Sequence, residues 1–109
     1  MVRKSLLKGN PIELANKYKR ALLESGVPVD KLILFGSYAK KTARYDSDLD
    51  ICVVSPKFGK KPFDEMIALG RIALKIDSLI EPHPFSPKDL ANKYDPLASE
   101  IRKTGIKIV

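Results

Sequence analysis

The sequence predicts an α/β or α+β fold in which helices pack on a small mixed β-sheet. Short apolar runs bounded by Gly, Asp or Pro are typical of strands, and they occur at residues 31–35, 48–54 and 77–85. Amphipathic stretches at residues 11–25 and 62–75 have the spacing of helices. Strands interleaved with helices favour a layered sheet, and 109 residues are enough for a single domain with one core.

The first predicted helix has clear signals at both ends. Asn10 can cap its amino end, Pro11 suits the first helical position, and Gly26 ends it. Between them, apolar residues recur at the spacing of one helix face. The residues expected in the core are Leu14, Ala15, Tyr18, Ala21 and Leu22.

The first predicted strand ends at Gly36, which is followed by Ser37. Because Gly has no side chain, backbone N–H groups and the Ser37 hydroxyl could approach a ligand closely. If residues 38–43 form a short helix, its amino end would favour an anion such as phosphate. Gly36 and Ser37 are therefore candidate nucleotide-binding residues.

Two carboxylates, Asp48 and Asp50, open the second predicted strand. Residues two apart in a strand share a face and lie about 7 Å apart. Neighbouring carboxylates repel each other unless a cation lies between them, and oxygen ligands suit a hard ion such as Mg²⁺ that carries phosphate oxygens. The pattern indicates a metal–nucleotide site. A capped, solvated turn is the alternative, but it does not explain acids that alternate with aliphatic residues in a strand.

Gly36-Ser37, ten intervening residues and then Asp48-Leu49-Asp50 resemble the signature of the DNA polymerase beta nucleotidyltransferase superfamily. The short chain resembles the minimal nucleotidyltransferases, often the MNT half of MNT/HEPN toxin–antitoxin pairs, and the match is strongest over residues 32–54. One departure is Lys40-Lys41, where many relatives carry a Gly after the Ala. The resemblance implies the polymerase-beta-like nucleotidyltransferase fold.

The second predicted helix begins at Pro62, with Asp64 and Glu65 in its first turn. Its spacing predicts one apolar stripe packed in the core. The residues assigned to this stripe are Phe63, Met66, Ile67, Gly70, Ala73 and Leu74.

The third predicted strand contains Pro82 and Pro84, which confine it to a sheet edge or to its first few pairings. In the superfamily a third carboxylate on a later strand completes the metal site, and the resemblance places Glu81 there. Asp77, at the helix–strand junction, is the alternative. His83 would share a face with Glu81 and could contact a ligand, but a lone histidine beside prolines is more often structural.

The last part of the chain predicts two short helices and a small strand. Ser86 caps a helix that runs to about Lys93, and Asp95-Pro96 precedes a second helix at residues 97–103. Residues 105–109 could form the strand.

Composition limits the classes of protein and partner. The net charge of +7 implies attraction to polyanions: a nucleoside triphosphate, an RNA or an acidic protein. Cys52 is the only cysteine, which excludes an internal disulfide and a cysteine-based zinc site. No apolar stretch approaches the roughly 18 residues of a membrane span, and residues 1–8 lack the apolar segment of a signal peptide. A cytoplasmic protein without membrane contact is expected.

The resemblance implies an Mg²⁺-dependent nucleotidyltransferase that moves a nucleoside monophosphate, AMP from ATP, onto a hydroxyl. Asp48, Asp50 and Glu81 would be catalytic and would hold two Mg²⁺ ions. The acceptor would be a tyrosine of a helical HEPN toxin, which makes the protein an antitoxin. A binding module that neutralises its partner by contact and a metal-dependent nuclease are the alternatives. The nucleotide base, the acceptor and a possible homo-oligomer stay open.

Overall fold

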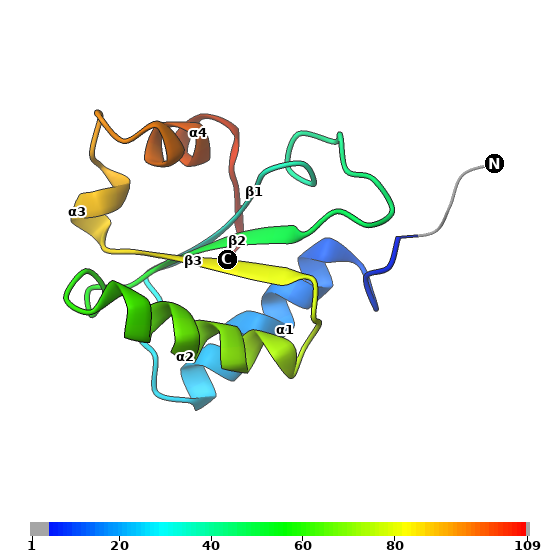
Figure 1. The fold of residues 1–109 in the computed structure, drawn as a ribbon, viewed down its shortest axis with the longest axis horizontal. Coiled ribbons are helices and arrows are strands. Elements are labelled where there is room, and N and C mark those ends of the chain that lie inside the picture. The colour runs from blue at the N-terminus through cyan, green and yellow to red at the C-terminus, as the bar shows by residue number, and fades with distance from the viewer. Residues whose placement is uncertain (1–4, 109) are drawn as a thin grey trace.

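The computed structural model describes residues 5–108 as a four-stranded sheet with helices on both faces (Figure 1). The strands lie in the order β3-β2-β1-β4; β1 is antiparallel to β2 and to β4, whereas β3 is parallel to β2. The predicted mixed sheet with packed helices is confirmed. The elements in chain order are α1 (Pro11–Glu24), β1 (Lys31–Phe35), β2 (Leu49–Val54), α2 (Pro62–Leu74), β3 (Ile80–Phe85), α3 (Pro87–Leu90), α4 (Pro96–Thr104) and β4 (Ile106–Ile108).

The two faces of the sheet form two apolar cores because successive side chains of a strand point to opposite sides. In β2, Leu49, Ile51 and Val53 pack in the core that the sheet shares with α1 and α2. Cys52 and Val54 pack in the core that it shares with α3 and α4. Both faces of β2 are therefore buried along most of the strand, as expected for a central strand.

Helix α1 has the predicted ends. The side chain of Asn10 accepts a hydrogen bond of 2.9 Å from the Ile12 N–H, and Gly26 follows the helix with a φ of 84°. The Tyr18 hydroxyl donates a hydrogen bond of 2.8 Å to the Leu69 carbonyl, which ties α1 to α2. The predicted core stripe is buried except for Ala21, which is half-buried.

Helix α2 begins at Pro62 as predicted, but most of its predicted buried stripe is wrong. Only Ala73 of that set is buried, and it is joined by Leu69. The helix is apolar around much of its circumference, so the spacing fits two different faces. Packing against the sheet and α1 selects the face that contains Leu69. The four large apolar side chains left exposed are Phe63, Met66, Ile67 and Leu74.

Strand β3 is an edge strand, as its prolines predict, but it begins at Ile80 rather than at Asp77. Asp77 is 2% exposed. Its carboxylate accepts hydrogen bonds from the Lys8 N–H at 2.7 Å and from the Leu79 N–H at 2.9 Å. Asp77 therefore stabilises the turn before the strand.

The short helix considered for residues 38–43 does not form. The chain turns instead, with hydrogen bonds from the Lys40 N–H to the Gly36 carbonyl (3.1 Å) and from the Thr42 N–H to the Ser37 carbonyl (2.9 Å). Lys41 adopts a φ of 60°, a left-handed value that is incompatible with a continuing helix. The argument from a helix dipole at Gly36 is therefore wrong.

The C-terminal elements agree with the sequence. The Ser86 hydroxyl caps α3 through the Asp89 N–H, and the Asp95 carboxylate caps α4 through the Leu97 N–H. Helix α3 ends earlier than predicted, at Leu90. Strand β4 extends the sheet beside β1. Over residues 5–108, no helix has the length and apolar character needed to cross a membrane.

Candidate functional site

Three side chains with metal-ligand atoms converge where β2 and β3 run side by side. The parallel register aligns Asp50 of β2 with Glu81 of β3, and His83 lies two residues farther along β3. The Nε2 atom of His83 lies 3.4 Å from Asp50 Oδ1 and 3.9 Å from Glu81 Oε1. We call Asp50, Glu81 and His83 the ligand group.

The spacing of the ligand group suits a divalent cation. One ligand atom from each residue lies within 4.8 Å of the other two. Ligands bound at 2.0–2.1 Å to an octahedral ion lie between about 2.9 and about 4.2 Å from one another. Small side-chain rotations would bring all three atoms into that range, so Asp50, Glu81 and His83 could hold a metal ion.

Asp48 lies at the margin of the ligand group. It is exposed, directly precedes β2, and interacts with Glu81 in a way that raises the pKa of that carboxyl group. Burial raises the pKa of Glu81, the interaction with Asp48 and the charge of Asp50 raise it further, and His83 opposes the rise. Asp48, Asp50 and Glu81 thus lie close together at one end of the sheet. A bound cation would reduce the repulsion between their negative charges.

Gly36 follows the last residue of β1 and lies beside the ligand group. Phe35 pairs with Asp50 across the two strands, so Gly36 follows directly beside that carboxylate. A Cβ atom at Gly36 would overlap Asp50 Oδ2, and the φ of 74° also favours glycine. The bare backbone of Gly36 therefore borders the ligand group. Ser37, the next residue, is half-buried.

His83 is the site residue that the sequence interpretation treated as structural. Its ring packs edge-on against Phe35, with centroids 4.9 Å apart and an interplanar angle of 68°, and this contact restrains the direction of Nε2. The available signal was its position two residues after Glu81 on the same strand face.

Neither Asp77 nor the single cysteine, Cys52, belongs to the ligand group. Asp77, the alternative third carboxylate, accepts one hydrogen bond from the Leu79 N–H in its own turn and one from the Lys8 N–H of the segment before α1. Cys52 is fully buried, and burial raises the pKa of its thiol to about 12. A thiol in that environment does not supply a nucleophile.

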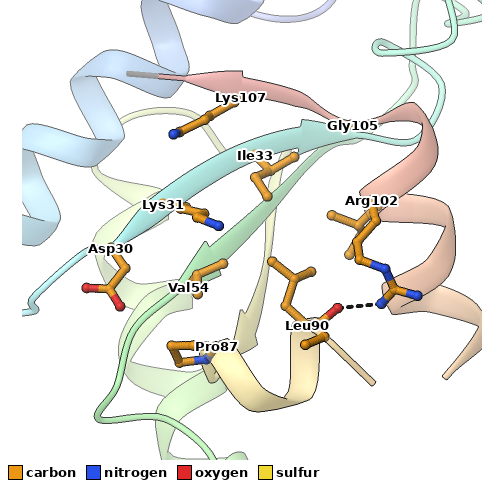
Figure 2. A pocket seen from close by; sticks show the side chains of 11 residues that line it. Asp30, Lys31, Ile33, Val54, Pro87, Leu90, Arg102, Gly105 and Lys107 are labelled. Carbon is orange, nitrogen blue, oxygen red and sulfur yellow. Dashed lines mark hydrogen bonds between the residues drawn. The ribbon is translucent and has the colours of Figure 1, made fainter. Parts of the chain in front are cut away.

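A cavity of about 360 Å³ lies at the opposite ends of β1 and β2, beside α3 and α4 (Figure 2). Its wall includes Ile33, Val54 and Leu90, and Lys31 and Lys107 lie near its rim. None of the candidate site residues lines it. The cavity is therefore separate from the ligand group, in which Glu81 is exposed and Asp50 and His83 are half-buried.

Comparison with known proteins supports the chemistry suggested by the site. A family model described as a nucleotidyltransferase domain matches residues 15–103. The fold is similar to the crystal structure of a Sulfolobus solfataricus protein provisionally assigned as a nucleotidyltransferase, with a TM-score of 0.65 and 18% sequence identity over 94% of this chain and 90% of the other. No curated protein matches the sequence.

Proposed function

The chain belongs to the nucleotidyltransferase domain family, and from that membership we propose that it transfers AMP from ATP to a hydroxyl group of a partner protein. The observation that carries this proposal is the ligand group beside the bare backbone of Gly36. It combines residues suited to a divalent cation with a glycine that leaves room for the Asp50 carboxylate. This arrangement matches the signature from which the nucleotidyltransferase superfamily was expected.

Asp48, Asp50 and Glu81 are proposed to hold two Mg²⁺ ions. Bound Mg²⁺ would neutralise charge on the triphosphate and lower the pKa of the acceptor hydroxyl. Asp50 lies beside Glu81 across the β2–β3 pair, where the two carboxylates could share an ion. Burial and the neighbouring acids raise the pKa of Glu81, and bound cations would favour its ionised form.

Gly36 and Ser37 are proposed to contact the triphosphate. Without a Cβ, Gly36 leaves room for the Asp50 carboxylate, and Ser37 follows it in the same turn. The turn is basic: Lys41 is exposed, and Lys40 forms an ion pair of 2.9 Å with Glu100. The positive charge of the turn and the net charge of +7 favour a polyanionic donor.

The acceptor is proposed to be a tyrosine hydroxyl on a helical HEPN-type toxin, which the protein would neutralise as an antitoxin. Support comes from the resemblance to the MNT half of MNT/HEPN pairs and from the exposure of Glu81 in the ligand group. A transferred AMP group would add bulk and negative charge to the acceptor. In this assignment the partner supplies the acceptor pocket.

The test is co-expression of the full chain with a HEPN-type protein encoded beside it, followed by intact-mass measurement of that partner. We expect a mass increase of one or more AMP units, and no increase with Asp50→Asn. A tight complex with an unmodified partner would instead favour neutralisation by contact. Nucleic-acid cleavage that requires Asp50, without nucleotide transfer, would favour the nuclease alternative.

A further inference from the structure

Helix α2 carries an exposed apolar stripe formed by Phe63, Met66, Ile67, Gly70 and Leu74. The exposed fractions are 76% for Phe63, 67% for Leu74, 40% for Met66 and 39% for Ile67. These residues recur at intervals of three or four, so they lie on one side of the helix. Four large apolar side chains in one continuous row mark an interaction surface.

Gly70 lies at the middle of the α2 stripe, and the fold of the chain does not require glycine there. A Cβ atom at Gly70 would meet nothing within 4 Å. Glycine in a helix interior lowers stability relative to alanine. A bare position in the centre of an apolar stripe is, however, suited to the close approach of a second helix.

The charged residues beside the stripe are arranged with opposite signs at its two ends. Asp64 lies in the first turn of α2, Arg71 in its last turn and Lys75 just beyond it. At 100° per residue the three lie within about 40° of one another around the helix, along the border next to Ile67. None of them forms an ion pair within residues 5–108.

We propose that α2 is a dimerisation helix, and that the α2 stripe packs against the α2 stripe of a second copy of this chain in an antiparallel, two-fold arrangement. In such a pair the same border of each helix meets its counterpart. Acidic and basic ends then face each other. The charged border of one helix is therefore complementary to the same border of the second copy. A border with charges of only one sign would repel its counterpart.

A two-fold axis between Ala68 and Leu69 matches the side chains in size. Phe63 becomes level with Leu74 of the second copy, and the large side chain of Ile67 becomes level with the bare Gly70. Asp64 lies between Arg71 and Lys75 of the second copy, within reach of both. The same axis thus aligns the apolar and the charged residues.

The contact is small, because it involves one helix of 13 residues in each copy, about 20 Å long. Interfaces below the standard size are usually weak or transient. We therefore expect a dimer in reversible equilibrium with the monomer, with a dissociation constant of micromolar to millimolar order.

Sedimentation equilibrium of the full chain over a range of concentrations tests the proposal. We expect a concentration-dependent dimer, and at least about tenfold weaker association for Ile67→Glu, which places a charge in the centre of the contact. Tyr94→Glu is the matched control: Tyr94 is 81% exposed, lies between α3 and α4, and should leave the dimer unchanged. Circular dichroism verifies that each variant is folded.

Exchanging the charges tests whether the dimer forms through the proposed antiparallel pairing of the two α2 helices. Asp64→Lys should weaken the dimer, and adding Arg71→Glu with Lys75→Glu should restore it, because every new charge then faces its opposite. A monomer at all concentrations, a dimer that survives Ile67→Glu, or a triple variant no tighter than Asp64→Lys would each overturn the proposal. This inference does not depend on the proposed transferase activity.

Discussion

A methyl group at Gly36 would overlap the carboxylate oxygen Oδ2 of Asp50, so the end of β1 and the start of β2 fit together only because position 36 lacks a side chain. This contact links the two halves of the sequence signature in space. It also predicts a specific defect. Gly36→Ala should displace the Asp50 carboxylate and lower kcat/KM for nucleotide transfer by about 100-fold, since small misplacements of reacting groups have effects of that order.

Gly26→Ala is the matched control for this substitution. Gly26 also has a positive φ, 84°, but a Cβ there would meet nothing within 4 Å. Both variants should lose about 1–2 kcal/mol of stability from backbone strain. Only Gly36→Ala should lose metal binding, measured by calorimetry. Equal effects of the two variants on metal binding would contradict the proposed role of Gly36.

Glu81 and Asp77 should give different defects when each is made neutral. Glu81→Gln should lower nucleotide transfer by about 100-fold or more while ATP binding changes less, because Glu81 is proposed to serve the attacking hydroxyl. The same variant should be more stable than the wild type without metal, since it removes one of three neighbouring acids. Thermal unfolding with and without Mg²⁺ measures this.

Asp77→Asn should affect stability rather than chemistry. The amide can accept only one of the two hydrogen bonds that the buried carboxylate receives from Lys8 and Leu79. A loss of about 1–3 kcal/mol is expected, with transfer unchanged at temperatures where the protein is folded. The opposite ranking of Glu81→Gln and Asp77→Asn in the transfer assay would make Asp77 the third carboxylate.

The site was predictable where local pattern alone determines position. Alternation in β2 places Asp50 on the opposite face from Leu49 and Ile51, and both of these are buried as that pattern requires. The position of Glu81 beside Asp50 depends on the register between β2 and β3, which no local pattern specifies. The superfamily resemblance supplied that position. The contact of His83 with Asp50 also crosses between strands, so it depends on the same register.

The buried face of helix α2 could not be predicted from the sequence for a different reason. Its sequence fits an apolar stripe through Phe63 and Leu74 as well as one through Leu69 and Ala73, and only the position of the sheet decides between them. The turn after Gly36 could not be predicted for a third reason. There, the return of the chain into antiparallel β2 overrides the local tendency of residues 38–43 to form a helix.

His83 should shift the metal preference of the site. Imidazole nitrogen suits Mn²⁺ better than it suits Mg²⁺, which prefers oxygen ligands. We expect the wild type to bind Mn²⁺ more tightly than Mg²⁺, and His83→Gln to weaken Mn²⁺ binding by about 10-fold with a smaller effect on Mg²⁺. Electron paramagnetic resonance of Mn²⁺ measures this without an activity assay. An unchanged Mn²⁺ affinity would exclude His83 as a ligand.

Gly70→Ala should stabilise the monomer. The position is in the interior of α2, its Cβ meets nothing within 4 Å, and alanine favours the helix by about 1 kcal/mol. For a chain of this size the midpoint of thermal unfolding should rise by about 4–8 °C. Measurement at low protein concentration keeps the dimer out of the comparison. A lower midpoint would mean that an added methyl group is not accommodated at this position.

Cys52 should make the stability of the fold depend on pH in the alkaline range. Burial raises the pKa of its thiol from 9.0 to about 12. Between these values the unfolded chain releases the thiol proton and the native protein keeps it, so the free energy of unfolding falls as pH rises, by up to about 1.4 kcal/mol per pH unit for one group. Tyr18 contributes in the same direction above its ordinary pKa, because burial also raises the pKa of its hydroxyl.

Cys52→Ala tests this dependence. The variant should be less stable at pH 8, because it leaves a small cavity. Between pH 9 and 11, however, its free energy of unfolding in urea should decline less steeply than that of the wild type. Parallel declines in the two proteins would show that the Cys52 thiol ionises equally in the native and unfolded states, contrary to its burial between the sheet and helices α3 and α4.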